Sequence, residues 1–280
     1  MSAIAAASIL SSVRELPALP AVVMELIQSL GDEDISAAQL ALKISRDQAL
    51  SAKTLRLANS SFYGMSRQVS SITDATAILG LRTLRSVAMA AGVAGSFSAT
   101  ACVGFDFKAF WRHSIGTALC ARSLAVVLKR EAETAFTLGL LHDIGRLALA
   151  SAFPKEFSET LRHQRELDRV PLEAERAVLG TDHAVVGGLI AEHWRFAPSI
   201  VQAIVTHHDP VAETGASLAD LLHVADNMAH ALDLSQTEDD MVPPLSMAAW
   251  SRLAINEDQC RQIFQQTESQ HESVCQALLM

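Results

Sequence analysis

The chain has 280 residues, half of them hydrophobic, and its formal net charge at pH 7 is -9. This length and hydrophobic content predict a globular protein of one large or two small domains, and they exclude a disordered chain. The acidic balance disfavours a broad nucleic-acid surface, so we expect no direct nucleic-acid binding.

The sequence predicts neither a membrane span nor a disulfide framework. Its longest apolar runs, such as residues 87–91, are far shorter than a membrane-spanning helix requires. Residues 1–10 are small and apolar but have no basic residue before them, which differs from a secretory signal peptide. The cysteines lie at positions 102, 120, 260 and 275 without a Cys-x-x-Cys pair, which suits a reducing compartment. We therefore expect a soluble, cytoplasmic protein that does not associate with membranes.

Helix signals follow one another closely through the first hundred residues. Pro20 suits a first helical turn, Gly31 suits a helix end, and Ser36 and Asp47 are good N-caps. Gly64 indicates a loop at residues 59–68. The predicted helices run from Pro20 to Gly31, from Ser36 to Ile44, from Asp47 to Leu57, from Ser71 or Thr73 to Leu79, and from Leu81 to Val93.

A hinge is predicted near residues 95–105, where Gly95 and Gly104 flank a stretch that contains Ser and Thr. It separates an N-terminal helical subdomain, residues 1–102, from a second helical subdomain, residues 103–235. The remaining segment, residues 236–280, begins with an acidic, proline-ended linker at residues 236–244. Within this segment Asn256 is suited to cap a helix that continues through Thr267.

No alternating pattern of useful length predicts a β-strand and no internal repeat is evident, so the expected fold is all-α. In the C-terminal segment Trp250, Leu253, Ile263 and Phe264 form an apolar stripe. That stripe could face a partner protein or a second copy of the chain, although packing back onto the body is the simpler use. The sequence leaves the oligomeric state open.

Five histidines and two aspartates stand out because they occur in an ordered series within apolar segments. Imidazole and carboxylate groups are ligands for divalent metals, so their convergence would create a site for one or two ions. An aspartate directly after a histidine suits a bridging role, because its two oxygens can face different metals. The series is His113, His142, Asp143, His183, His207, His208 and Asp226.

The surroundings of these residues predict that they are buried. His142 and Asp143 lie in a mostly apolar segment that predicts a helix, and adjacent helical side chains can address one point from different angles. The doublet His207 and His208 ends an apolar stretch, which predicts a helix end that reaches a cavity. Asp226 is embedded in another apolar helix. Burying so many polar groups without a counter-charge is costly, so a shared cation is the economical explanation.

The alternative for any single histidine is a structural role. A lone histidine on an apolar face is more often a hydrogen-bonded core residue than a metal ligand. We therefore give no ligand role to five further histidines, which we expect at the surface, at helix caps or behind the ligands. These are His163, His193, His223, His230 and His271.

Three segments of the second subdomain resemble the HD superfamily and, more narrowly, its HDOD branch (HD-related output domain) of bacterial signalling proteins. They are Gly139-Leu140-Leu141-His142-Asp143-Ile144-Gly145, residues 182–194 beginning with Asp182-His183, and residues 203–210 containing His207-His208-Asp209-Pro210. The first subdomain resembles the HDOD branch through Leu16-Pro17-Ala18-Leu19-Pro20, Ile44-Ser45-Arg46-Asp47, residues 55–60 and residues 72–81. The similarity runs from about residue 16 to beyond residue 226.

The resemblance implies a helical architecture of two subdomains, and it places all seven residues of the series where metal-binding relatives have ligands. HD-superfamily members are typically metal-dependent phosphohydrolases, whereas HDOD members are usually regarded as regulatory domains. The implied cofactor is one or two divalent ions of iron, manganese or zinc. In a catalytic site Asp143 would bridge or orient, and the planar guanidinium of Arg146 would hold a phosphate.

Three departures narrow this expectation. Related cyclic di-GMP phosphodiesterases carry a Gly-Tyr-Pro signature after the histidine doublet, but the only tyrosine here is Tyr63, far upstream. Arg146 stands where those enzymes usually have Lys, and Ala109 replaces the acidic ligand sometimes found one helical turn before His113. These differences disfavour cyclic di-GMP hydrolysis and make a second metal less firmly predicted than the first.

Two functions remain as hypotheses. The first is an HDOD-type signalling protein with a structural or sensory metal site, which acts by binding signalling protein partners. The alternative is a metal-dependent phosphohydrolase that acts on a phosphate mono- or diester, with a phosphorylated small molecule or nucleotide as its ligand. No Walker or Gly-x-Gly-x-x-Gly loop is present to specify that ligand.

Overall fold

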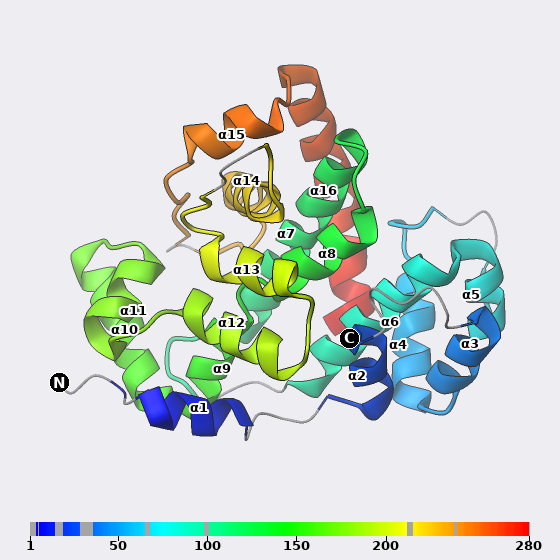
Figure 1. Ribbon diagram of the computed structural model, residues 1–280, viewed down its shortest axis with the longest axis horizontal. Coiled ribbons are helices and arrows are strands. Elements are labelled where there is room, and N and C mark those ends of the chain that lie inside the picture. The colour runs from blue at the N-terminus through cyan, green and yellow to red at the C-terminus, as the bar shows by residue number, and fades with distance from the viewer. Residues whose placement is uncertain are drawn as a thin grey trace.

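Helices make up all regular structure in the part of the chain that the computed structural model describes, residues 4, 6–14, 19–28, 36–64, 68–97, 101–211, 215–237 and 240–279 (Figure 1). The all-α prediction is therefore confirmed. The first helices are α1 (Ala6–Arg14), α2 (Ala21–Gln28), α3 (Ala37–Ser45), α4 (Gln48–Ala58), α5 (Ile72–Leu79) and α6 (Leu81–Ser96). They are followed by α7 (Phe107–Val127), α8 (Ala132–Leu141), α9 (Ile144–Ala152), α10 (Pro154–Leu167), α11 (Pro171–Leu179), α12 (His183–His193), α13 (Pro198–Thr206), α14 (Leu218–Ala231), α15 (Met247–Leu253) and α16 (Glu257–Leu279).

Three predicted N-caps in the first hundred residues are confirmed. The Ser36 side chain accepts a hydrogen bond from the Gln39 amide at 3.2 Å and completes a capping box at the start of α3. The Asp47 side chain accepts from the Leu50 amide at the start of α4, and Ser71, rather than Thr73, caps α5. Each cap satisfies an amide that the first helical turn leaves without a partner, and this is why these helices begin where the pattern predicts.

Helix α7 lies at the centre of the molecule. It is buried almost continuously from Ala109 to Ala125, because α8, α14 and α16 pack around it. A helix enclosed in this way buries residues on every side rather than along one stripe. His113, which is 5% exposed, is therefore held in the interior of the protein.

Two glycines of the His-Asp motif allow neighbouring helices to approach closely. A Cβ atom on Gly139 would lie 2.7 Å from the Cα of Ala118 on α7, and a Cβ atom on Gly145 would lie 2.0 Å from the carbonyl oxygen of His183 on α12. These neighbours are backbone atoms of a close-packed interior, so they cannot yield as a flexible side chain can. Helices α8 and α9 can thus hold the intervening residues 142–143 between α7 and α12.

One hydrophobic core runs through both predicted subdomains. It includes Leu26 and Leu57 from the first 102 residues, together with Leu141 and Ile190 from the later helices. Helix α1 of the first predicted subdomain also packs on α12 of the second. The amide of Ile4 donates to the carbonyl oxygen of Leu179 at 3.0 Å beside this contact.

The division into residues 1–102, 103–235 and 236–280 remains a prediction. Residues 98–100 of the expected hinge and the predicted helix end at Gly31 lie outside the described residues.

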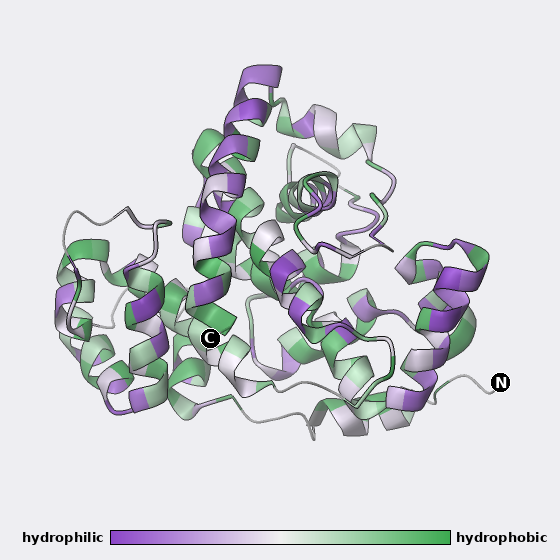
Figure 2. Cartoon of the chain, turned by 180° about the vertical axis from the view of Figure 1, so that it is seen from behind, coloured by the Kyte–Doolittle hydropathy of each residue, from purple (hydrophilic) through white to green (hydrophobic). Residues whose placement is uncertain are grey.

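The C-terminal segment packs back onto the body of the protein. Helix α16 lies against α7, α4 and α6, with Val274 and Leu278 buried, and Phe264 packs against a second core formed by residues of α7 and α14. The helix continues to Leu279 rather than ending near Thr267, because its apolar side persists beyond that residue. Seen from behind, much of its visible side is hydrophilic (Figure 2).

The longest described helices, α7 and α16, have 21 and 23 residues. Neither of them, nor any other helix in the described part of the chain, combines the length and the apolar character needed to cross a membrane.

Candidate metal centre

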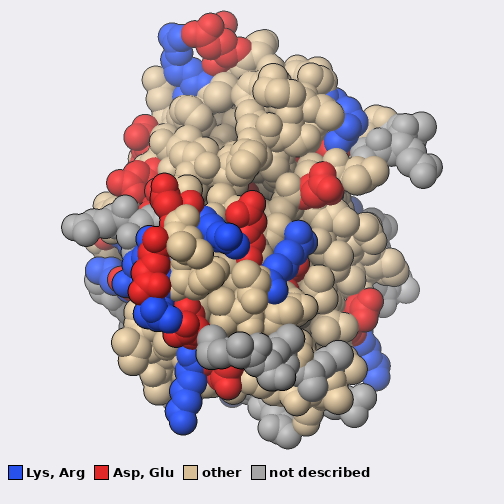
Figure 3. All heavy atoms as spheres, turned by 90° about the vertical axis from the view of Figure 1, so that its left-hand side faces the viewer, with Lys and Arg blue, Asp and Glu red and all other residues tan. Residues whose placement is uncertain are grey.

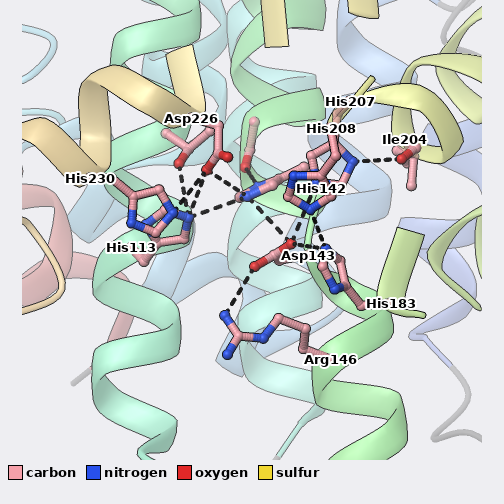
Figure 4. Close-up of polar contacts among 12 residues, drawn as sticks. His113, His142, Asp143, Arg146, His183, Ile204, His207, His208, Asp226 and His230 are labelled. Carbon is pink, nitrogen blue, oxygen red and sulfur yellow. Dashed lines mark hydrogen bonds and ion pairs between the residues drawn. The ribbon is translucent and has the colours of Figure 1, made fainter. Parts of the chain in front are cut away.

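All seven residues predicted as ligands converge on one interior region of the molecule (Figure 4). Six of the side chains are buried and His208 is partly buried. Five places in the fold supply them: α7 carries His113, the α8–α9 connection carries His142 and Asp143, α12 begins with His183, α13 is followed by His207 and His208, and α14 carries Asp226.

His142 and Asp143 form the turn between α8 and α9, whereas the sequence predicted that they lie within a helical segment. The helix breaks here because the backbone of Asp143, with φ -98° and ψ 12°, leaves the helical region. The Nδ1 of His142 lies 2.7 Å from the carbonyl oxygen of Gly139, an acceptor that the end of α8 leaves without an amide partner. A ring that donates through Nδ1 keeps the lone pair of its Nε2 available for a metal.

His207 repeats at the end of α13 the arrangement of His142 at the end of α8. Its Nδ1 lies 2.6 Å from the carbonyl oxygen of Ile204, three residues earlier. The carbonyl oxygen of His207 in turn accepts from the Nδ1 of His223 at 2.7 Å, and the amide of Ser246 donates to the Nε2 of His223 at 2.8 Å. His223 therefore holds the backbone of a candidate ligand, in line with the structural role expected for it.

Glu175 is a residue of this region that the sequence reasoning missed. Its side chain is buried on α11, where Oε2 accepts from the amide of His183 at 2.8 Å and from the ring Nδ1 of His183 at 2.6 Å. A carboxylate behind a histidine fixes the tautomer and direction of the ring and makes its other nitrogen a stronger ligand. No sequence signal distinguishes Glu175 from Glu173, which is exposed on the same helix.

Asp143 lies at the centre of a first group of candidate ligand atoms. Its Oδ1 is 3.2 Å from the Nε2 of His183 and 3.8 Å from the Nε2 of His207. The Nε2 of His208 lies 2.7 Å from that of His183. The other oxygen of Asp143, Oδ2, faces the Nη1 of Arg146 at 3.5 Å. The two oxygens therefore do not face two groups of histidines, which is the geometry that we expected of a bridging aspartate.

Asp226 lies at the centre of a second group. Its Oδ1 is 3.0 Å from the Nε2 of His113 and 3.3 Å from the Nε2 of His142. Because the Nε2 of His142 is also 3.6 Å from the Oδ1 of Asp143, this ring stands between the two groups (Figure 4). The Nε2 of His230 lies 3.6 Å from the same oxygen of Asp226.

His230 also lies in this region, although the sequence analysis gave it no ligand role. A signal was present, because Asp226 and His230 are four residues apart, and this spacing places two side chains on the same face of a helix. The Nδ1 of His230 lies 2.5 Å from Oδ1 of Asp240. The other oxygen of Asp240 accepts from the hydroxyl of Ser235 at 2.5 Å.

The donor atoms of this region fit a divalent cation. The Nε2 of His207 is buried and has no hydrogen-bond partner among the described residues. The Nε2 atoms of His183 and His208 face each other, although the His183 ring is already paired through Nδ1. A shared cation satisfies such lone pairs, whereas buried polar groups without partners are costly. Imidazole and carboxylate ligands suit iron, manganese and zinc alike.

The carboxylates draw positive charge into the region. Burial alone would raise the pKa of Asp143, but the imidazoles beside it hold that pKa well below its usual range. The pKa of Asp226 is lowered by its histidine neighbours in the same way, again against the effect of burial. Burial lowers the pKa of His207 to about 4, so this ring is neutral at neutral pH and can offer its Nε2 lone pair.

Five of the seven residues, all but His142 and His207, line a cavity of about 370 Å³, and Arg146 lines it beside Asp143. Apolar walls with a few converging polar groups are typical of a small-molecule site. The walls come from the segment before α7 and the start of α7, from α10 and α11, and from the segment after α14. They include Phe105, Phe110, Leu161, Arg165, Pro171, Arg176, Ser235, Asp240, Met241 and Pro243.

The side of the molecule that carries α10 and α11 mixes charges of both signs. Figure 3 shows Lys and Arg side chains beside Asp and Glu side chains on this face. Arg162 pairs with Glu166 at 2.7 Å, and Arg176 pairs with Asp182 at 2.7 Å. Attraction of a polyanion requires a continuous basic surface, and this face does not present one.

Comparison with known proteins agrees with the resemblance seen in the sequence. Residues 16–210 match the model of the HDOD domain. A candidate phosphohydrolase from Shewanella amazonensis is 30% identical, with a TM-score of 0.79 over 97% of this chain and 98% of that chain. An HDOD domain protein with unknown function from Geobacter sulfurreducens is 25% identical, with a TM-score of 0.80 over 98% of both chains.

A curated relative, an uncharacterized protein from Treponema pallidum, is 27% identical over 206 residues. The matched region is 73% of this chain and 40% of the relative, so this chain spans less than half of that protein's length.

Proposed function

This chain belongs to the HDOD family, and from this premise we propose that it is a bacterial signalling protein whose buried His and Asp cluster binds one or two divalent metal ions. The cavity above the cluster receives a phosphorylated small molecule or a nucleotide. The observation that carries the proposal is the convergence of the Nε2 atoms of His142, His183 and His207 on Oδ1 of Asp143, at 3.2 to 3.8 Å.

Acceptors of the protein itself orient these three rings. Each holds its Nδ1 against an acceptor of the protein, Gly139, Glu175 or Ile204, at 2.6 to 2.7 Å. Metal-binding histidines typically make such a hydrogen bond through the ring nitrogen that does not bind the metal. The bond fixes the tautomer and reduces the side-chain conformational freedom that is lost on metal binding. A purely structural histidine has no need to direct its remaining nitrogen to a shared point.

Arg146 is the residue of the cavity floor best suited to hold a phosphate. Its Nη1 lies 3.5 Å from Asp143, and its Nε lies 3.9 Å from Oε1 of Glu175. These two carboxylates restrict the direction of the guanidinium, whose planar fork can pair with two phosphate oxygens. When bound, a divalent ion supplies a coordinated water of lowered pKa and neutralises charge on a phosphoryl oxygen.

Hydrolysis of a phosphate mono- or diester is the second candidate function. It is favoured by the position of Arg146 beside the candidate ligands in an accessible cavity. The Shewanella amazonensis protein at 30% identity is described as a candidate phosphohydrolase, which also supports it. In a purely regulatory protein the same site would sense its ligand, and signalling partners would bind elsewhere on the surface.

Metal content tests the first part of the proposal. We would purify wild type, His142→Ala and His208→Ala anaerobically and measure bound metals by mass spectrometry, with His193→Ala as a control because His193 is exposed on α12. We expect near-stoichiometric metal in wild type and the control, and strongly reduced metal in both ligand variants. A folded wild type that holds no metal and resists reconstitution would refute the proposal.

Turnover separates the two candidate functions. Metal-loaded protein would be assayed on a panel of nucleotides and phosphoesters beside Arg146→Ala, with Arg162→Ala as the control because Arg162 lies in an exposed ion pair. Hydrolysis that is lost only in Arg146→Ala supports an enzyme. Binding of a phosphorylated ligand without turnover supports a sensory site, and absence of turnover on the whole panel removes the hydrolase proposal.

A further inference from the structure

We propose that His230, together with His113 and Asp226, forms a separate half-site for a second divalent ion, and that Asp240 is the positioning residue of that half-site. This inference rests on the proposed metal-binding function and goes beyond it by assigning a ligand outside the predicted series. It also divides the cluster into two halves, each with its own carboxylate.

The first support is the grouping of the ligand atoms. One ligand atom each from His113, Asp226 and His230 lies within 4.8 Å of the other two. A different set, Asp143, His183, His207 and His208, meets the same condition. No residue belongs to both of these sets, and a third set, His113, His142 and Asp143, connects them. They therefore describe two neighbouring centres with His142 between them.

The second support is the distance between His230 and Asp226. The Nε2 of His230 lies 3.6 Å from Oδ1 of Asp226, which is too long for a direct hydrogen bond. Two ligand atoms that share one ion at ~2.1 Å stand roughly 3.0 to 3.5 Å apart. The 3.0 Å separation of His113 Nε2 from the same oxygen lies in this range. A cation can therefore fill the 3.6 Å gap between His230 and Asp226, which is slightly above the spacing of shared ligands and too long for a hydrogen bond.

The third support is the orientation of the His230 ring. Its Nδ1 is held 2.5 Å from Oδ1 of Asp240, so the proton is placed on the far side of the ring from Asp226. The ring lies beside that of His113, with centroids 4.3 Å apart, and both rings direct Nε2 to one oxygen of Asp226 (Figure 4). Asp240 thus acts on His230 as Glu175 acts on His183, by fixing the ring through Nδ1.

Helix α14 supplies two of the three ligands of the half-site. The position one helical turn before His113 on α7 is Ala109, which has no ligand atom. His230 lies one turn after Asp226 on the facing helix α14, so the pair presents a carboxylate and an imidazole from one helix face. The half-site is therefore built from two packed helices, and Asp240, in the segment after α14, holds the His230 ring.

The test is a titration of metal-free protein with Co²⁺, followed by the visible absorption of the bound ion and by mass spectrometry after desalting. Wild type and the exposed control His193→Ala should bind two equivalents. His230→Ala should bind one. Asp240→Asn should bind two, with the second weakened by about 10- to 100-fold. Circular dichroism of each variant verifies that it is folded.

The possible results separate this inference from the proposed function. If wild type binds one ion and His230→Ala still binds that ion with equal affinity, the inference is wrong while the metal site stands. The inference is also wrong if both His230→Ala and Asp240→Asn bind two equivalents of Co²⁺ with the affinity of wild type. If wild type binds no metal, the proposed function fails as well. Should His230→Ala not fold, the weakened second equivalent in Asp240→Asn decides the question.

Discussion

Glu175 accepts two hydrogen bonds from one residue, His183: one from its amide at 2.8 Å and one from its ring Nδ1 at 2.6 Å. A single carboxylate thus fixes both the start of α12 and the direction of a candidate metal ligand. The geometry of the candidate metal site therefore depends on residues that hold the ligands as well as on the ligands themselves.

Replacing this carboxylate should weaken metal binding without removing a ligand. We expect Glu175→Gln to lower metal affinity by about 10- to 100-fold, because outer partners of metal-binding histidines have effects of this size. The measurement is metal retained after dialysis against a graded series of chelator concentrations. Glu166→Gln is the matched control, since Glu166 lies in an exposed ion pair with Arg162. Equal retention in Glu175→Gln and wild type would show that the ring needs no carboxylate behind it.

Close approach of α9 and α12 at Gly145 should be required for stability and for metal binding. An alanine Cβ there would meet the carbonyl oxygen of His183 at 2.0 Å, so Gly145→Ala must push the two helices apart. We expect a loss of about 1 to 3 kcal/mol in unfolding free energy, as is typical of overpacking, together with reduced metal content. Urea unfolding and mass spectrometry measure the two effects.

Gly95→Ala is the control for that substitution, because its Cβ would meet only the flexible end of Lys53, at 3.2 Å. Alanine favours a helix more than glycine does, so this variant should be neutral or slightly stabilised. Equal stability of the Gly145 and Gly95 variants would contradict the close approach.

The buried Asp220 should make stability depend on pH. Burial would raise the pKa of its carboxyl, but hydrogen bonds to it from the Arg252 side chain and the Ser217 amide lower that pKa below its ordinary value. A carboxyl of lowered pKa stabilises the fold above its unfolded pKa of about 3.9, and the contribution is lost as the pH falls through the folded value. We expect Asp220→Asn to cost about 1 to 3 kcal/mol at neutral pH, and less in acid.

Urea unfolding of wild type and Asp220→Asn, at neutral pH and at about pH 3, measures this difference. Asp168→Asn serves as a control because Asp168 is exposed. A difference that stays constant between the two pH values would mean that the charge of Asp220 contributes nothing.

Burial among the packed helices should protect three of the four cysteines from alkylation, and the packing of α16 covers two of them, Cys120 and Cys275. Burial raises the pKa of Cys120 and of Cys275 to about 12, and Cys102 is also buried. Cys260 is only partly buried. Because the thiolate is the reactive form, iodoacetamide should label Cys260 first in the native protein and all four cysteines after unfolding. Rapid native labelling of Cys275, detected by mass spectrometry of peptides, would contradict the docked position of α16.

Local signals in the sequence sufficed for the helical class, for several helix starts and for the series of candidate ligands. Asn256, for example, was expected to cap the last helix, and the amide of Gln259 donates to its side chain at 2.9 Å. A cap depends on residues three positions apart, so it can be predicted without knowledge of the fold. The end of that helix could not be predicted from the sequence, because Val274 and Leu278 pack against residues of other helices.

Tertiary structure decided which polar residues share the site and how they are grouped. Glu175 carries no local signal that separates it from surface residues, and the only local signal for His230 is its four-residue spacing from Asp226. Both join the cluster because α11 and α14 pack beside it. His113 and Asp226 are far apart in sequence, yet they meet at 3.0 Å. The physical reason is range: caps and periodicity act over a few residues, whereas the position of a side chain in a shared cavity depends on the packing of the whole core.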